Sequence, residues 1–409
     1  MDAATPKWKR ILLEANWLNE RRVRAYPVIF LVIYAIAIAL YLLVSPAMVD
    51  PLNKPVGTDF MNVWAAGKMA LDKKPAEAYD WDKHGAVQKK ALPWKKCMVV
   101  PYYGWHYPPM FLMAAAVLAL LPYGFALLLW MMATLPAYLA ALRAIVPERA
   151  AIAAALAFPA VFVNLGHGQN GFLTAGLLGG GVALLEKRPY LAGVLFGLLA
   201  YKPQFGILIP VALLMGWHWR AIFSAGLTVV LTAAASYKLF GLETWQAFFN
   251  SLPLTRTEVL EKGSTGWEKI QSIFAAVRMW GGSVEAAYAA QAVFAFIAAL
   301  AVAWAWKRKG DMRMKGAILV TACLMATPYL LDYDLMVLAL PVAWLVAAGL
   351  ETGFRPYEKT LLAACFLLPL LSRSLGLLGL PPAPFLMLAL LWLLATRMAK
   401  PAHSYLRVS

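Results

Sequence analysis

The sequence predicts an all-α polytopic membrane protein, with a bundle of about 12 membrane helices in one integral membrane domain over residues 1–409. Hydrophobic residues make up 62% of the chain, whereas soluble globular domains contain about 45–50%. Charged residues make up only 14%, and the mean hydropathy is +0.65. Lipid leaves a spanning chain no partners for its backbone polar groups except its own, so long apolar runs favour helices.

The apolar runs define the membrane segments in order along the chain. The predicted segments cover residues 27–45, 108–142, 151–165, 170–186, 190–201, 203–216, 220–240, 284–306, 316–331, 334–350, 360–376 and 383–398. We expect the long segment 108–142 to break near Pro122 and to cross the membrane once. Segments 190–201 and 203–216 are each shorter than the roughly 20 residues of a full span. They are expected to form a hairpin that turns at Lys202, because proline disfavours helix at the preceding residue.

The positive charges indicate the orientation of these segments. The first 26 residues are basic, and Lys307-Arg308-Lys309 is the strongest later cluster. The positive-inside rule places both in the cytoplasm. We therefore attribute the net charge of +16 to membrane topology and expect no binding of nucleic acid. With this orientation residues 46–107 and 241–283 form two long extracytoplasmic loops; the opposite count would put several basic turns outside.

Both loops have the character of structured segments. In loop 46–107 the residues Phe60, Val63, Trp64, Gly67 and Leu71 follow helical spacing. A second helix is expected over residues 81–92, and loop 241–283 has similar aromatic clusters. We predict amphipathic interfacial helices in both loops, suited to handling a substrate that is partly in lipid.

Unusual polar residues gather at hydrophobic ends on the extracytoplasmic side. They are Asp59, the run His167-Gly168-Gln169-Asn170, Lys202, Asp332 and Asp334. Placing such groups in or near lipid is expensive, so residues of this kind are candidates for function.

Several short motifs, in this order and spacing, resemble glycosyltransferase family 87. The motifs are Gly57-Thr58-Asp59-Phe60, Tyr79-Asp80, Trp105-His106-Tyr107-Pro108-Pro109, Leu120-Leu121-Pro122, Gly168-Gln169-Asn170, Ala192-Gly193, Leu198-Leu199-Ala200-Tyr201-Lys202-Pro203 and Thr327-Pro328-Tyr329. The resemblance covers about residues 57–335.

This resemblance implies a GT-C fold and a polyprenyl-phosphate sugar donor, typically polyprenyl-phosphate-mannose, used on the extracytoplasmic face. It implies that Asp59 is the catalytic base and that Lys202 lies near the donor phosphate. Many members of the family carry a histidine in the late proline-containing motif. Here that stretch reads Leu331-Asp332-Tyr333-Asp334, so the role of that histidine does not carry over.

Glycosyl transfer from a lipid phosphate has chemical requirements that these residue types meet. A carboxylate can remove the acceptor proton, and a lysine beside a low-dielectric site can stabilise the leaving phosphate. Phosphate is already a good leaving group, so we expect no metal and no cofactor, and a single displacement would invert the anomeric centre. The candidates are Asp59 as base, Lys202 and Arg256 for the phosphate, and His106, Tyr107, His167, Gln169, Asn170, Asp332 and Asp334 for the substrates.

Each candidate also has a structural explanation. Asp59 could cap the helix that begins at Phe60, since aspartate is a favoured N-cap residue. Lys202 could extend its ammonium group to the membrane interface. The turn at 167–170 could start a capped helix, and Arg256 could be a solvated charge. Asp80 and its near neighbour Asp82 imitate a metal-binding motif, but helix capping explains them better.

The sequence therefore predicts a membrane glycosyltransferase, a mannosyltransferase in the first instance, that acts on a lipid or glycan acceptor. We expect it in a bacterial inner membrane, with its site facing the periplasm and membrane lipids around it. The alternative is a transporter or flippase of a lipid-linked or small polar substrate. A transporter is expected to show internal repeats and polar residues on both faces, and neither pattern is evident in the sequence.

Overall fold

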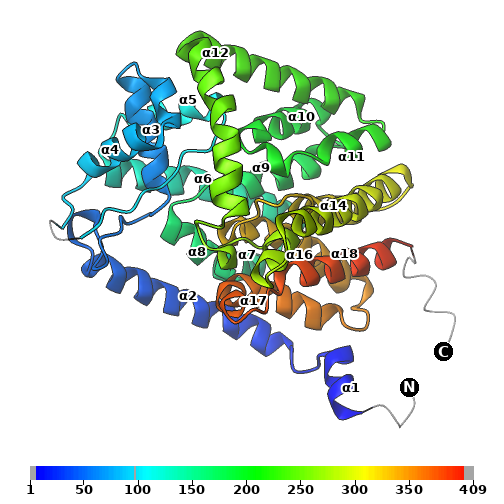
Figure 1. Ribbon diagram of the computed structural model, residues 1–409. Coiled ribbons are helices and arrows are strands. Elements are labelled where there is room, and N and C mark those ends of the chain that lie inside the picture. Colours follow the sequence, from blue (N-terminus) through cyan, green and yellow to red (C-terminus); the bar gives the residue numbers. More distant parts are fainter. Residues whose placement is uncertain (1–5, 96–97, 400–409) are drawn as a thin grey trace.

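A computed structural model describes residues 6–95 and 98–399 as a bundle of helices (Figure 1). Within these residues there is no β-strand, and extended pairing is limited to isolated bridges such as Ile270 with Leu331. The main helices are α1 (Lys7–Glu14), α2 (Glu20–Leu43), α3 (Phe60–Leu71), α4 (Trp81–Ala91), α5 (Pro109–Leu118), α6 (Tyr123–Ile145), α7 (Arg149–Ala157), α8 (Pro159–His167), α9 (Gly171–Leu184), α10 (Pro189–Leu198), α11 (Ile209–Met215), α12 (Trp219–Thr255), α13 (Ile273–Met279), α14 (Val284–Lys307), α15 (Met312–Ala326), α16 (Ala339–Thr352), α17 (Glu358–Leu377) and α18 (Ala383–Ala399).

Six helices of the described chain are long and apolar enough to cross a membrane. They cover Glu20–Leu43, Tyr123–Ile145, Trp219–Glu261, Val284–Lys307, Asp332–Thr352 and Glu358–Leu377. Each of the other predicted segments also forms helix, but in shorter pieces. An integral membrane protein built of helices is thus supported, while the count of about 12 membrane helices stays a prediction.

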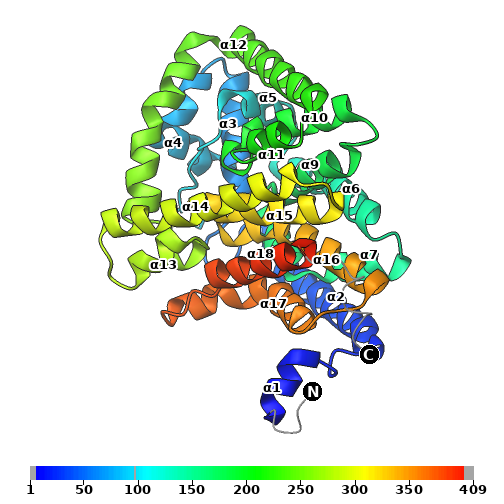
Figure 2. The same cartoon turned by 90° about the vertical axis from the view of Figure 1, so that its right-hand side faces the viewer.

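Prolines and glycines account for the breaks. The expected interruption near Pro122 is present, because α5 ends at Leu118 and α6 begins at Tyr123. Segment 151–165, predicted as one helix, divides into α7 and α8 where Pro159 begins the second. Helix α12 bends sharply at Gly241, whose φ of 79° is left-handed. Figure 2 shows the second limb of α12 descending along the left-hand edge of the molecule.

The basic segments meet at one end of the bundle. Arg313 of α15 binds Glu351 of α16 with an Nη1–Oε1 distance of 2.6 Å, and Arg397 of α18 pairs with Glu358 of α17. The backbone N–H of Tyr357 donates to the carbonyl of Leu13 at 3.0 Å, which attaches α1 to the same end. These contacts gather on one face the basic segments that the charge pattern assigns to one side.

The predicted hairpin at Lys202 is present. Helix α10 is followed by two short 3-10 turns, η3 (Leu199–Tyr201) and η4 (Pro203–Phe205), and then by α11. Past α11, the ring of His218 lies 5.7 Å from that of Trp306 at the basic end of α14. The chain therefore leaves the basic end, turns at Lys202 deep in the bundle, and returns.

The first long loop folds over the opposite end, where α3 and α4 lie at the left of Figure 1. Both predicted helices are confirmed, and Asp80 caps α4 by accepting from the backbone N–H groups of Asp82 and Lys83 at 3.1 Å. Helix α3 is buried on nearly all sides against α5 and α4. Its placement as an interfacial helix, like that of the helices in loop 241–283, stays a prediction.

Candidate active site

Two glycines bring the first outer loop against the turn between α8 and α9. Gly57 and Gly168 both have left-handed backbones, with φ of 71° and 62°. A Cβ at Gly168 would lie 2.7 Å from Cβ of Phe60 and 3.3 Å from Cα of Gly57. Only glycine permits this approach. As a result the backbone N–H of Asp59 donates to the carbonyl of His167 at 3.0 Å.

Asp59 lies at the start of α3 but does not cap it. Its side chain accepts no hydrogen bond from the first turn of the helix. Instead, Nε2 of Gln169 donates to Oδ2 of Asp59 at 2.9 Å. The Asp59 side chain is 22% exposed. The capping explanation is therefore not supported, and this carboxylate is oriented by an amide while remaining in reach of solvent.

His167 lies beside this carboxylate. Its Nδ1 shares a hydrogen bond of 2.8 Å with Oγ1 of Thr58 and lies 3.9 Å from Oδ2 of Asp59. Its side chain is 25% exposed, and the ring of Tyr333 lies 5.8 Å away. Asp59 and His167 thus form the part of the site that a substrate can reach.

A continuous hydrogen-bond network leads inward from Asp59. The hydroxyl of Tyr107 donates to Oε1 of Gln169 at 3.2 Å, and Nδ2 of Asn170 donates to that hydroxyl at 2.8 Å. Nζ of Lys202 then donates to Oδ1 of Asn170 at 2.9 Å. Burial raises the pKa of Tyr107, which keeps its hydroxyl protonated as a donor.

The inner end of the network is a buried ion pair. Nζ of Lys202 lies 2.5 Å from Oδ1 of Asp334, and the two side chains are 5% and 0% exposed. The backbone N–H of Leu331 donates to the other oxygen of Asp334 at 3.2 Å. The explanation of Lys202 as a lysine that reaches the membrane surface is therefore wrong: its ammonium group is held inside by a carboxylate.

Two candidates, His106 and Arg256, lie outside this hydrogen-bond network. Nδ1 of His106 and Oγ1 of Thr255 are 3.0 Å apart, a contact that joins the first outer loop to the second limb of α12. Burial lowers the pKa of His106 to about 4, although Asp59 acts in the opposite direction, so His106 is neutral at neutral pH. Arg256 follows Thr255 and is 59% exposed; its Nε lies 3.2 Å from Oε1 of Glu261. No contact found among the described residues connects Arg256 to the network.

Asp332 is also buried, but it faces other partners than Asp334. Its Oδ1 accepts from the backbone N–H of Tyr333 at 2.8 Å. Asp332 and Asp334 both belong to the first turn of the short helix η7 (Asp332–Leu338). The predicted pair therefore divides, and of the two only Asp334 bonds to the lysine.

Sequence reasoning missed several members of the site. Thr58 holds His167, and the hydroxyls of Thr174 and Tyr201 lie 2.6 Å apart beneath Asn170. The signals were modest: Thr174 follows Asn170 by one helical turn, and Tyr201 precedes Lys202. Among residues 6–95 and 98–399, no group of three or more His, Cys, Asp or Glu side chains could hold a metal ion.

Comparison with known proteins identifies the family. The sequence model of glycosyltransferase family 87 matches residues 105–331, which is more than half of the chain. This range contains His106, Gln169, Asn170 and Lys202 but begins after Asp59. No curated protein and no solved structure matches the chain. The chain belongs to glycosyltransferase family 87 and is a membrane glycosyltransferase.

Proposed function

We propose that the protein transfers a hexose, mannose in the first instance, from a polyprenyl-phosphate sugar to a lipid or glycan acceptor, with Asp59 as general base. The observation that carries this proposal is the geometry of Asp59. It is the partly exposed carboxylate of the polar network, and Gln169 fixes one of its oxygens at 2.9 Å. A base must be oriented by its neighbours and still be open to the acceptor.

The proposed reaction is a single displacement. The acceptor hydroxyl gives its proton to Asp59, and the acceptor oxygen forms a bond to the anomeric carbon of the donor. The bond from that carbon to the phosphate oxygen breaks, and the polyprenyl phosphate leaves with the electron pair. Attack opposite the leaving group inverts the anomeric centre. No step requires a cofactor from outside the chain.

Lys202 is proposed to donate a hydrogen bond to the donor phosphate. An ammonium group has three N–H donors, of which Asn170 and Asp334 bind two in this structure. No acceptor for the third is found among the described residues, and we assign it to a phosphate oxygen of the donor. Asp334 already balances the charge of Lys202, so a second cation is needed to neutralise the phosphate. We assign this role to Arg256, whose neighbour Thr255 contacts His106.

The remaining candidates divide by burial. His106 and His167 are partly exposed and are proposed to contact the sugar or the acceptor directly. Tyr107, Gln169, Asn170, Asp332 and Asp334 are buried, and we propose that they hold the exposed groups and Lys202 in place. We propose that the donor binds from the extracytoplasmic side, which the basic segments at the opposite end support.

Donor use tests the proposed function. The purified protein is given polyprenyl-phosphate-mannose or a nucleotide-linked mannose, together with a membrane lipid extract as acceptor, and labelled product is measured. We expect product from the lipid-linked donor alone. Transfer from the nucleotide sugar, or from neither donor, would contradict the proposed donor class.

A further inference from the structure

Helix α1 has no role in the proposed active site, and its surface is unusual. None of its residues is buried, and Trp8 and Ile11 are 64% and 48% exposed. Trp8, Ile11 and Leu12 fall on one stripe at helical spacing, whereas Lys7 and Arg10 lie on another face. Such a basic amphipathic helix is typical of segments that lie in the membrane interface.

The structure attaches α1 to the basic end of the bundle. Oγ1 of Thr360 donates to the carbonyl of Leu12 at 2.7 Å, and the backbone N–H of Tyr357 donates to that of Leu13 at 3.0 Å. In Figures 1 and 2, α1 stands apart from the packed helices near the beginning of α2. Its apolar stripe is therefore open to lipid at the level where the basic clusters lie.

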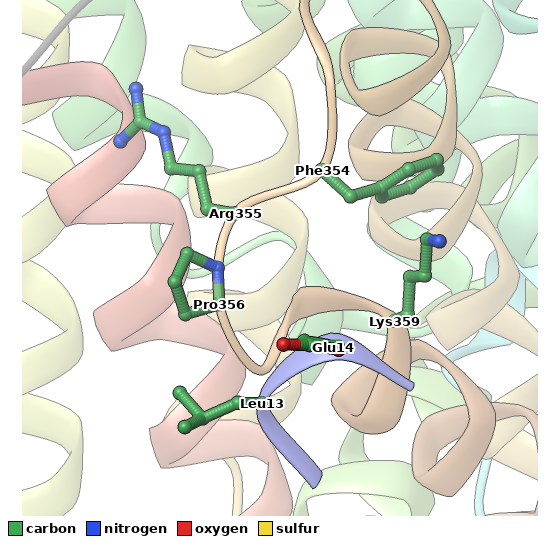
Figure 3. Close-up of a pocket in the computed structure, with 6 residues that line it drawn as sticks. All are labelled: Leu13, Glu14, Phe354, Arg355, Pro356 and Lys359. Carbon is green, nitrogen blue, oxygen red and sulfur yellow. The ribbon is translucent and has the colours of Figure 1, made fainter. Parts of the chain in front are cut away.

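A cavity of about 310 Å³ lies between α1 and the turn that joins α16 to α17 (Figure 3). It is lined by Leu13, Glu14, Phe354, Arg355, Pro356 and Lys359. This volume is at the small end of the range of ligand pockets, about 300–1,000 Å³. The cavity suits a lipid headgroup, because it lies at the basic end and has the size of a small polar group.

The charges of the cavity favour an anionic headgroup that also carries hydroxyl groups. Nζ of Lys359 lies 5.6 Å from the centre of the Phe354 ring, while the Arg355 guanidinium turns toward α18 and donates to the carbonyl of Thr396 at 3.1 Å (Figure 3). Lys359 supplies a cation for a phosphate, and Glu14 supplies an acceptor for hydroxyl donors. With the basic residues of α1 nearby, the local charge is positive in sum.

From these observations we infer that the cavity between α1 and α17 binds the phosphoglycerol headgroup of an anionic phospholipid from the leaflet at the basic end. Lys359 contacts the phosphate, and Glu14 accepts hydrogen bonds from the glycerol hydroxyls. The site is separate from the active site and is independent of the reaction proposed above.

Lipid binding to the purified full-length protein tests this inference. The protein in detergent is titrated with phosphatidylglycerol at high ionic strength, and bound lipid is counted by native mass spectrometry. High salt suppresses diffuse attraction between exposed charges. The variants are Lys359→Gln, which removes the cation, and Leu13→Trp, which fills the cavity without a change of charge. Lys9→Gln is the control, because it removes an equal charge from the exposed surface of α1.

We expect Lys359→Gln and Leu13→Trp each to weaken binding by ~5-fold or more: the first removes a charge-assisted hydrogen bond to the phosphate, and the second fills the space of the headgroup. Lys9→Gln should bind as the parent does, and soluble glycerol phosphate should not compete. Parental affinity in both cavity variants would overturn the inference. So would equal binding of phosphatidylcholine or phosphatidylethanolamine, which would show that the cavity does not select an anionic headgroup.

Discussion

At the residue scale, the buried pair of Lys202 and Asp334 sets the strictest requirement of the site. The ammonium nitrogen and the carboxylate oxygen are 2.5 Å apart, and neither side chain is more than 5% exposed. Desolvation of two such charges is offset only while both are present and hydrogen-bonded. Removal of one partner leaves the other buried without a counter-charge.

We therefore expect Lys202→Met to lower the free energy of unfolding by about 3–5 kcal/mol in addition to any loss of transfer. The double variant Lys202→Met/Asp334→Leu should recover much of that stability but not the activity. Thermal unfolding in detergent and the transfer assay measure the two effects. A Lys202→Met protein as stable as the parent would show that the pair contributes little to folding.

The sequence identified most of this network but not its connections. Asp59, Gln169, Asn170, Lys202 and Asp334 are polar residues at apolar ends, and Tyr107 belongs to the motif before Pro108. The partner of Lys202 could not be predicted, because Asp334 lies 132 positions away and only the packing of η7 brings it close. Arg256 was chosen for its charge alone, and it pairs with Glu261 instead.

At the scale of elements, Asp59 depends on a close crossing between α3 and α5. A Cβ added at Gly67 would lie 2.0 Å from the carbonyl oxygen of Ala115 and 2.7 Å from Cβ of Ala119. Backbone atoms of this kind do not move as a flexible side chain does. The glycine therefore fixes the distance between the two helices, and through it the position of the loop at the start of α3.

Gly67→Ala should destabilise the protein by about 1–3 kcal/mol, the usual cost of overpacking, and should reduce transfer. Gly226→Ala in α12 is the matched control, because nothing lies within 4 Å of its added Cβ. There alanine should be neutral or stabilising by about 0.5–1 kcal/mol. Equal thermal unfolding temperatures for the two variants would contradict the close crossing.

His84 connects α4 to α3 and makes their packing sensitive to pH. The side chain is fully buried, and its Nε2 lies 3.2 Å from the carbonyl of Asn62 while Nδ1 faces the amide of Gln88 at 3.3 Å. Burial lowers the pKa of His84 from 6.5 to about 4. Between these values the unfolded chain binds a proton that the folded chain does not.

The free energy of unfolding should therefore fall as the pH is lowered from 6.5 to about 4. His84 alone should contribute on the order of 3 kcal/mol over that window. His84→Gln, measured by thermal unfolding at several pH values, should show a weaker decline, with part of the remainder due to His106. An unchanged pH dependence in this variant would exclude His84 as a major source.

At the scale of the whole molecule, the apolar pattern predicted where helices form better than where they end. Segments 190–201 and 203–216 were too short to span, and the structure shows the expected hairpin. The division of segment 151–165 at Pro159 was not predicted. A proline inside an apolar run can kink one continuous helix or begin a second helix, and the sequence does not distinguish the two cases. The burial of α3 on both faces depends on α4, α5 and α6, which the spacing within α3 does not reveal.

The two ends of the molecule give a test of sidedness. In a background without the three native cysteines, Lys90→Cys lies on the exposed face of α4 in the first outer loop, and Lys309→Cys lies at the basic end. We expect an impermeant thiol reagent to label Lys90→Cys in intact cells and Lys309→Cys only after the membrane is opened. The reverse pattern would contradict an extracytoplasmic site.

The central claim is that Asp59 removes the acceptor proton, and turnover of Asp59→Asn with a purified polyprenyl-phosphate-mannose donor tests it most directly. Asparagine keeps the shape of the side chain, and its amide oxygen can still accept from Gln169, so folding and donor binding should be retained. Turnover should fall by ~10²-fold or more, the usual contribution of a general base. Asp80→Asn, which changes a capping carboxylate of the same loop, should keep nearly parental turnover. Transfer by a stable Asp59→Asn protein at the parental rate would contradict the assignment.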